Sequence, residues 1–391
     1  MNKKKQNLAE RQKKLVQTCI RKTLAFSINT GQQLQVRAQQ FLGVPRAIAD
    51  ADGIPCKGVK ANTTKVLERR YSGIIVAFIP PPRHPDVIVL DGMVILNSSP
   101  LKIASTRTFQ HYIRFLVHRW IMPYLKVPAT VELHIVLDDP DRNGLSPKTI
   151  ERQRRDSNRN FRSSDVIPVE DDIAFPPNWQ TFLSNRLQKR LLVNYTSLKL
   201  LEADMSRHLR TNQKLVVVGG FDGENRDKAY SIRRGQSTER EPTLDSNHEE
   251  SDSRVWLHAF GSKGQKILIY SPDTDTYHVG PPLLERYSNT EVTVQLAPST
   301  TVELFSQSRF LLLNNLRQAL HEDPDLADIE RPALTSVLQT VFVATGCDYV
   351  SFFARIGKAT FFIPCFKMLH LSQGLRWQIM APLLTKNITS P

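Results

Sequence analysis

The sequence is poor in cysteine and contains no long apolar run. Its 391 residues include four cysteines, which lie far apart and form neither a Cys-x-x-Cys pair nor the Cys/His spacing of a zinc site. No apolar stretch approaches the roughly 18 residues of a membrane span, and no apolar segment of a signal peptide follows the lysine-rich start. We therefore expect reduced thiols and a nuclear or cytoplasmic protein that is neither secreted nor inserted in a membrane.

Acidic residues are outnumbered by basic ones, and the formal net charge is +14. An excess of this size favours a polyanionic partner such as nucleic acid or an acidic membrane surface. Half of the excess lies in residues 1–26, where eight basic residues accompany one glutamate. Such a run is typical both of a solvated or nuclear-targeting tail and of a phosphate-binding segment. We assign residues 1–84 to a basic N-terminal extension.

Apolar runs and helical periodicities alternate along the rest of the chain. Short apolar runs at 86–91, 131–137, 214–218 and 266–270 are separated by helical patterns at 108–125, 178–209 and 253–260. This alternation predicts an α/β domain over residues 85–391, with a three-layer, mostly parallel central sheet and helices on both faces. The charged, Ser-rich stretch 222–248 predicts a flexible loop. Functional sites in such sheets form at the carboxyl ends of the strands.

Acidic residues follow several of these apolar runs. Others stand at the start of the helical pattern that precedes the run at 266–270. The set comprises Asp91, Asp138, Glu250, Asp252, Asp273, Asp275 and Asp348. A single aspartate after a strand is most often a helix cap or turn former. Several carboxylates at one sheet edge, however, repel one another unless divalent cations neutralise them. Ligands that are all oxygen favour Mg²⁺ or Mn²⁺, and two such ions about 4 Å apart would activate a water and stabilise a departing phosphate oxygen.

Two stretches resemble a known family of nucleases. HEESDSRVWLHAFGSKGQKILIYSPDTDTYHVG resembles the interior of the XPG/flap-endonuclease family, where an E-A-E helix start precedes a strand and a D-x-D pair. ATGCDYVSFFARIGKATFF resembles the GCDY…GIG stretch of that family, and VIVLDGMVIL and LHIVLDD resemble its first two strands and aspartates. The resemblance covers roughly residues 85–370 in the family's order. It implies a PIN-like 5′-3′ nuclease fold that hydrolyses phosphodiester bonds in DNA, or alternatively RNA, with two divalent ions.

The resemblance also assigns roles to individual residues. It makes the seven acidic residues metal ligands, residues 148–213 a helical arch-like insertion, and residues 345–375 a helix-hairpin-like DNA-binding region. Lys189 and Arg190 would assist catalysis, although a solvated helix face explains them equally well. The implied nucleic-acid contacts are Arg186, Lys189, Arg190, Arg355, Gly357 and Lys358. We expect a monomer.

The sequence departs from the family pattern at several places. About 85 residues precede the strand that resembles the family's first one, Asp252 replaces a glutamate, and Arg355 stands where the family has a glycine. Two alternatives therefore stay open. One is an inactive PIN-like module that binds nucleic acid. The other is a phosphatase of the haloacid-dehalogenase type, in which Asp273 of the D-x-D-x-T motif would be the nucleophile.

Overall fold

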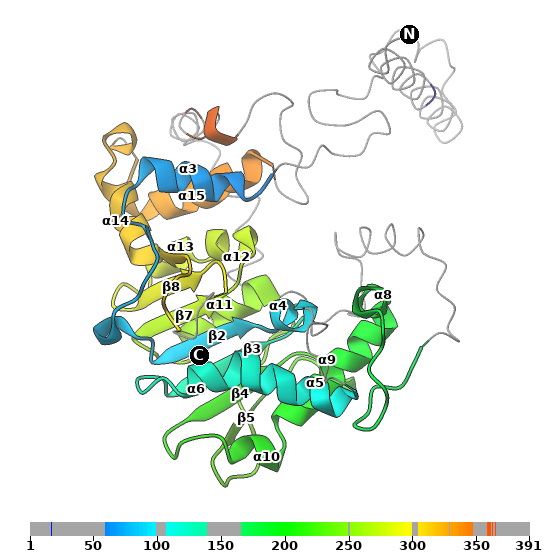
Figure 1. The fold of residues 1–391 in the computed structure, drawn as a ribbon. Helices are drawn as coiled ribbons and strands as arrows, with labels where there is room; N and C mark the ends of the chain where they lie inside the picture. Colours follow the sequence, from blue (N-terminus) through cyan, green and yellow to red (C-terminus); the bar gives the residue numbers. More distant parts are fainter. Residues whose placement is uncertain are drawn as a thin grey trace. The chain divides into compact units, whose positions relative to one another are not determined.

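The computed structural model describes residues 17, 59–98, 107–138, 166–248, 251–298, 304–327, 329–346, 358–360, 362 and 364. The chain forms two compact units, one from Tyr71–Ala319 and one from Met1–Arg70 with Leu320–Pro391 (Figure 1). The expected boundary after residue 84 is therefore too late. The reason is β1 (Ile75–Val76), a two-residue strand before a run of prolines that already pairs with the sheet.

Within the described residues of the Tyr71–Ala319 unit, nine strands form one mixed sheet in the order β1-β9-β8-β7-β2-β3-β4-β5-β6. The central strands are parallel: β8 (Glu291–Gln295), β7 (Lys266–Tyr270), β2 (Val87–Asp91), β3 (Glu132–Val136) and β4 (Lys214–Val218). Antiparallel strands flank them, β9 (Phe310–Leu312) with β1 on one side and β5 (Ala229–Arg233) with β6 (Glu239–Arg240) on the other. The predicted α/β class is confirmed.

The central strands form because their apolar runs are continuous. Every residue of β2 and of β4 is buried, which is the pattern of parallel strands covered on both faces. The register aligns Leu90 of β2 with Ile135 of β3 and with Tyr270 of β7. The carboxyl ends of these neighbouring strands therefore lie at one edge of the sheet.

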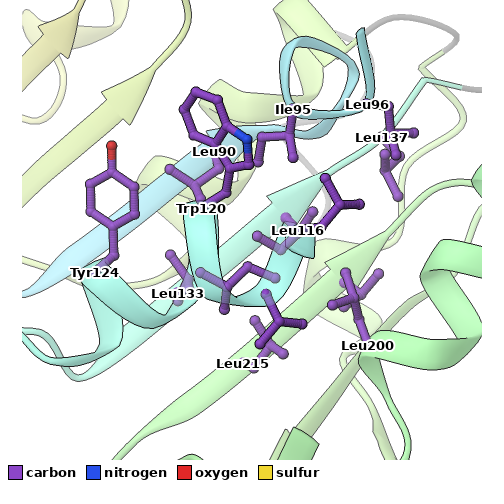
Figure 2. Close-up of a cluster of buried hydrophobic side chains, with 14 of the residues drawn as sticks. Leu90, Ile95, Leu96, Leu116, Trp120, Tyr124, Leu133, Leu137, Leu200 and Leu215 are labelled. Carbon is purple, nitrogen blue, oxygen red and sulfur yellow. The ribbon is translucent and has the colours of Figure 1, made fainter. Parts of the chain in front are cut away.

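One face of the sheet is covered by two groups of helices. Between β2 and β3 lie α4 (Gly92–Asn97), α5 (Phe109–Leu116), the π-helical η2 (Val117–Ile121) and α6 (Met122–Leu125). Between β3 and β4 lie α8 (Trp179–Ser184), α9 (Arg186–Leu200) and α10 (Ala203–Ser206). Leu116 and Trp120 belong to the same buried cluster as Leu90, Leu133 and Leu215 of the strands (Figure 2).

The helices of residues 179–206 do not form an arch that stands apart. Trp179, Phe182, Leu192 and Val193 are buried in this same cluster. Because α8 and α9 supply apolar side chains to the layer over the sheet, they are part of the connection between β3 and β4. The prediction of an arch-like insertion is wrong for this part, and residues 148–165 of the insertion lie outside the described residues.

The opposite face is covered by α11 (Ser251–Gly261), followed after β7 by α12 (Thr274–Val279) and α13 (Pro281–Leu284). α11 packs against β2, β3 and β7, and its residues Val255, Trp256 and Ala259 are buried. Helices therefore lie on both faces, as predicted. None of the described helices is both long enough and apolar enough to cross a membrane.

The stretch 222–248 is ordered, which contradicts the prediction of a flexible loop. It contains β5 and β6, with the short helices η4 (Gly223–Asn225) and η5 (Pro242–Leu244). Ala229, Ser231 and Ile232 are buried, and the Ser231 hydroxyl donates to Glu241 Oε1 at 2.8 Å. The polar composition of this stretch gave no indication of a strand. Ser231 can be buried there because its hydroxyl is hydrogen-bonded within the same hairpin.

The unit of Met1–Arg70 with Leu320–Pro391 contains α3 (Asn62–Arg70), η6 (Pro324–Leu326) and α15 (Arg331–Ala344), while α14 (Leu313–Glu322) runs across the division of the chain. In this unit the Arg70 guanidinium bonds to both carboxylate oxygens of Asp323 at 2.7 Å. The apolar residues 341–344, which come shortly before Asp348, form the end of α15 and not a strand. A short apolar run does not distinguish a buried strand from a buried helix.

Candidate metal centre

Three neighbouring parallel strands deliver aspartates to one sheet edge. β2 lies between β3, the next parallel strand of the chain, and β7, which follows much later. Asp91 is the last residue of β2, and Asp138 and Asp273 follow β3 and β7 by two and three residues. In open α/β sheets, ligands bind outside the carboxyl ends of the strands at such a change of direction in strand order. The aspartates lie at this position.

Asp91 caps a helix and is also one of the aspartates at this sheet edge. Its Oδ1 accepts hydrogen bonds from the backbone N–H of Met93 at 2.9 Å and of Val94 at 3.4 Å, which caps α4. The Ser251 hydroxyl also donates to Oδ1, at 3.2 Å. The carboxyl is 5% exposed. Burial, with a contribution from the charge of Asp138, raises the pKa of Asp91 to about 7.

The start of α11 is tied to β3 and carries the next carboxylate. The Ser251 N–H donates to Asp138 Oδ1 at 2.7 Å, which fixes the helix start against the end of the strand. Asp252 accepts a hydrogen bond from the Thr276 hydroxyl. Burial and then the charge of Asp273 raise the pKa of Asp252 to about 8, with smaller contributions from Asp91 and Asp138. Carboxylates from β2, β3, α11 and the end of β7 therefore share one electrostatic environment.

Three of the carboxylates are close enough to hold one ion. Asp252, Asp273 and Asp275 each offer one oxygen, and these oxygens all lie within 4.8 Å of one another. Asp273 also caps α12, because its Oδ1 accepts the N–H of Asp275 at 3.1 Å. This donor set contains only oxygen, which fits a hard divalent cation such as Mg²⁺ or Mn²⁺.

We use the name acidic cluster for Asp91, Asp138, Asp252, Asp273 and Asp275. The structure brings these five predicted ligands together. Glu250 and Asp348 lie outside the described residues. Residues 341–344, upstream of Asp348, belong to α15 and not to a strand, so strand order gives no reason to place Asp348 at the same sheet edge.

A buried arginine, not predicted from the sequence, supports the end of β3. Arg254 is fully buried and donates to the carbonyl oxygens of Leu137 at 2.9 Å and Ser246 at 3.3 Å, as well as to that of His248. Gly219 lies beside it with a φ of +82°, and a Cβ there would stand 2.3 Å from the Leu137 oxygen. Backbone and side chain thus hold the residue next to Asp138 in place.

Hydroxyl groups were also missed. Ser251, Ser271 and Thr276 are buried among the carboxylates, and their hydroxyl groups bond to Asp91 and Asp252. Serine and threonine after a strand are common turn formers. The only signal available in the sequence was therefore their closeness to the D-x-D and E-x-D pairs.

The start of α9 lies near the same end of the sheet. Arg190 bonds to Asp222 Oδ1 at 2.7 Å and Asn194 donates to the Gly220 oxygen at 2.9 Å. Gly220 and Asp222 follow the carboxyl end of β4, as the acidic cluster follows β2, β3 and β7 (Figure 1). Arg186 is exposed and Lys189 partly exposed. Basic side chains therefore lie near the edge where the carboxylates gather.

Lys358 does not face solvent. Its ammonium is buried and donates to Thr345 Oγ1 and the Gly346 oxygen at 2.8 Å and to the Phe342 oxygen at 3.3 Å. These acceptors lie at the C-terminal end of α15, where a cation is favourable. The prediction that Lys358 binds backbone phosphates is therefore wrong for this structure. Arg355, Gly357 and most of residues 345–375 lie outside the described residues.

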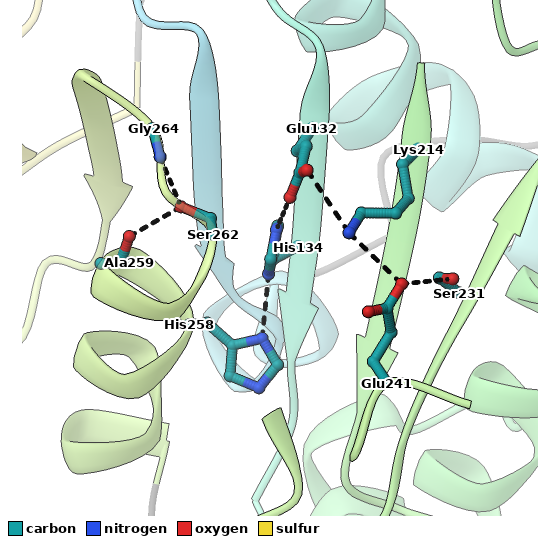
Figure 3. A network of polar contacts seen from close by, with 9 residues as sticks. All are labelled: Glu132, His134, Lys214, Ser231, Glu241, His258, Ala259, Ser262 and Gly264. Atoms are coloured by element: carbon teal, nitrogen blue, oxygen red, sulfur yellow. Dashed lines mark hydrogen bonds and ion pairs between the residues drawn. The ribbon is translucent and has the colours of Figure 1, made fainter. Parts of the chain in front are cut away.

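A second polar network lies nearer the other end of the strands. Glu132, at the start of β3, bonds through Oε2 to His134 Nε2 at 3.0 Å. His134 in turn meets His258 of α11. The Lys214 ammonium lies 3.3 Å from both Glu132 and Glu241 (Figure 3). This network joins β3, β4 and α11 and is distinct from the acidic cluster.

No protein-family model matches this chain, and no curated protein matches it.

Proposed function

We propose that this protein is a metal-dependent nuclease that hydrolyses phosphodiester bonds, with DNA as the expected substrate and RNA as the alternative. The observation that carries the proposal is the acidic cluster at the carboxyl ends of β2, β3 and β7. Two of its carboxyls have raised pKa values, the signature of like charges held together in a poorly solvated place. A cation that bound there would remove this repulsion.

Each part of the acidic cluster has an expected role. Asp252, Asp273 and Asp275 would hold one divalent ion, and Asp91 and Asp138 would complete a second position beside it. When bound, Mg²⁺ or Mn²⁺ supplies an activated water and stabilises charge on the phosphate oxygens. The protein's own contribution is to fix the carboxylates on rigid strand and helix ends and to shield them from bulk water.

The basic start of α9 would attract and orient the polyanion. Arg186, Lys189 and Arg190 lie in its first two turns, and Arg190 already bonds to an exposed carboxylate, Asp222. Positive charge near a scissile phosphate stabilises the charge that develops on it. We expect the protein to bind nucleic acid as a monomer in the nucleus or cytoplasm, with an affinity that falls with salt because counterions are released.

The resemblance to the XPG/flap-endonuclease family supports the proposal at the positions that carry it. The first two strand-ending aspartates, the E-x-D helix start and the D-x-D pair are the stretches that contribute Asp91, Asp138, Asp252, Asp273 and Asp275. In the phosphatase alternative Asp273 would act as a nucleophile, and that chemistry leaves Asp91 and Asp138 without a role.

The experiment is cleavage of end-labelled flap, bubble, single-stranded and duplex DNA and RNA by the purified full chain with Mg²⁺ or Mn²⁺. Asp273→Asn should lower the rate by about 100-fold or more. Asp204→Asn is the matched control, because Asp204 is 84% exposed and lies on α10, and it should cut normally. Binding without cutting under either metal would favour the inactive module, and hydrolysis of an aryl phosphate without cutting would favour the phosphatase.

A further inference from the structure

Two hydroxyl groups connect carboxylates of the acidic cluster that come from different elements. Ser271, the residue after β7, is fully buried. Its Oγ lies 3.4 Å from Asp91 Oδ2 and 2.9 Å from Thr276 Oγ1. Thr276, also fully buried, donates to Asp252 Oδ1 at 2.5 Å. The contacts form a continuous path from Asp91 through Ser271 and Thr276 to Asp252, which we call the hydroxyl bridge.

The hydroxyl bridge joins three parts of the fold. Asp91 ends β2, Ser271 and Thr276 lie on either side of the start of α12, and Asp252 lies in the first turn of α11. A hydroxyl has one hydrogen to donate and can accept others. Thr276 gives its hydrogen to Asp252, so Ser271 gives its own either to Thr276 Oγ1 or to Asp91 Oδ2, and in either case the two hydroxyl oxygens lie between the carboxylates of Asp91 and Asp252. The spacing of two carboxylates from separate elements is thereby tied to a pair of short side chains.

The backbone around Thr276 is held by contacts that do not involve its hydroxyl. The Thr276 carbonyl oxygen accepts a hydrogen bond from Trp256 Nε1 at 2.8 Å. The Trp256 ring packs so closely on Gly280 that a Cβ there would lie 2.0 Å from it. Because Trp256 already fixes α12 against α11, removal of the hydroxyl alone should leave both helices in place.

We propose that Ser271 and Thr276 are positioning residues of the acidic cluster, and that their hydroxyl bridge sets the spacing of Asp91 and Asp252 on which the affinity for a divalent cation depends. This inference rests on the proposed function in that it requires a cation site. Side chains that hydrogen-bond to metal ligands without touching the metal hold those ligands in position. Their removal typically lowers the affinity for the metal by about 10- to 100-fold. A role in folding alone would change stability and leave the affinity unchanged.

The test measures Mn²⁺ binding to the full chain by titration calorimetry, together with the melting temperature in EDTA. Thr276→Val keeps the shape of the side chain and removes the hydroxyl, and Thr276→Ser keeps the hydroxyl. We expect Thr276→Val to weaken Mn²⁺ binding about 10-fold and Thr276→Ser to stay within about twofold of the wild type. Ser271→Ala tests the other half of the hydroxyl bridge with the same expected loss, should Thr276→Val fail to fold. Thr181→Val, at an exposed threonine of α8, is the matched control.

The possible outcomes distinguish the positioning role of the two hydroxyls from the proposed function. If the wild type binds Mn²⁺ and both Thr276→Val and Ser271→Ala bind it equally tightly, the inference is overturned and the proposed function stands. Equal losses in Thr276→Val and Thr276→Ser would also overturn it, because the hydroxyl would not be the cause. If the wild type binds no Mn²⁺, the proposed function and the inference fall together.

Discussion

The imidazole rings of His134 and His258 meet in the interior of the protein with their Nδ1 atoms 2.9 Å apart. Both rings are fully buried. Because the Glu132 carboxylate lies 3.0 Å from His134 Nε2, this nitrogen carries the hydrogen that is donated to Glu132. His134 Nδ1 is then the acceptor and His258 Nδ1–H the donor between the rings. The network thus specifies one tautomer for each ring.

The first prediction concerns these tautomers. Burial lowers the pKa of both His134 and His258 below the ordinary value, so both rings should be neutral in the folded protein at about pH 7.5. Nitrogen chemical shifts should show an Nε2–H form for His134 and an Nδ1–H form for His258. In urea both rings should titrate near the ordinary value of about 6.5. An imidazolium in the folded protein at that pH would contradict the assignment.

The second prediction compares a buried with an exposed ion pair. Lys214 lies between Glu132 and Glu241, so Lys214→Met leaves two largely buried carboxylates without their counter-charge. We expect a loss of about 2–3 kcal/mol in the free energy of unfolding, measured with urea. The matched control is Arg207→Met, because the Arg207 and Asp204 side chains are 78% and 84% exposed, and it should change stability by about 0.5 kcal/mol or less. Equal effects of the two variants would contradict the prediction.

The third prediction is the pH dependence of stability without metal. The pKa values of Asp91 and Asp252 are about 7 and about 8 in the folded protein, against about 3.9 for an unfolded aspartate. Between about pH 4 and about pH 8 the folded state therefore holds protons that the unfolded chain has released. The free energy of unfolding in EDTA should fall as the pH rises through this window, by up to about 1.4 kcal/mol per pH unit for each proton.

Thermal unfolding at about pH 5.5 and about pH 8 measures this effect. Asp252→Asn should lose less stability between the two values, because asparagine does not titrate. Added Mg²⁺ should raise the melting temperature more at the higher pH, where fewer protons compete with it for the carboxylates. A melting temperature in EDTA that rises with pH over this range would show that the carboxyls are not held as described.

The fourth prediction tests the close approach behind Asp138. Gly219 has a φ of +82° and no room for a Cβ, whereas Gly223 has a φ of +61° and nothing within 4 Å. Replacing either glycine with alanine restricts the unfolded chain to the same extent. Gly223→Ala should therefore cost about 1 kcal/mol, and Gly219→Ala about 2 kcal/mol more, because the Leu137 carbonyl must move. Urea unfolding of the two variants gives this difference directly, and similar losses would show that the close approach is easily relieved.

The fifth prediction concerns the start of α9. Replacing Arg186 and Lys189 together with glutamine should weaken DNA binding to all sequences alike. It should also reduce the slope of log affinity against log salt by about 1 for each phosphate that the variant no longer neutralises. Fluorescence anisotropy over a salt series measures both quantities. Arg207→Gln together with Arg234→Gln, at two exposed arginines, removes the same two charges and is the control for net charge. An unchanged slope in the α9 variant would place the phosphate-binding residues elsewhere.

The central strands were predictable because each is a continuous apolar run, and the aspartates after β2, β3 and β7 followed from the same pattern. β8 was not singled out, since Thr293 and Gln295 interrupt it. Both are nevertheless buried, and Gln295 accepts a hydrogen bond from the Tyr124 hydroxyl at 3.1 Å. A buried polar residue is recognisable only once its partner is known, and here the partner lies 171 residues away.

The sequence also did not reveal which charged side chains point into the protein and which point toward solvent. Lys358 and Arg254 are both buried cations that donate to backbone carbonyl oxygens. A lysine that binds phosphate and one that caps a helix end look alike in a sequence, because the difference lies in where the chain turns next. The acidic residues were better predicted because carboxylates at the ends of adjacent parallel strands have little choice of direction.

The hydrogen bond between Ser271 and Asp91 joins residues 180 positions apart. A growing chain that has been made only as far as β4 contains Asp91 and Asp138, but it lacks α11, β7 and α12. Pairing over such a distance is among the slower steps of folding, because a long loop must close first. The carboxylates therefore come together late in synthesis, and a chain that is stalled or cut before Thr276 contains no assembled acidic cluster. The assembled acidic cluster is therefore confined to chains that extend beyond α12.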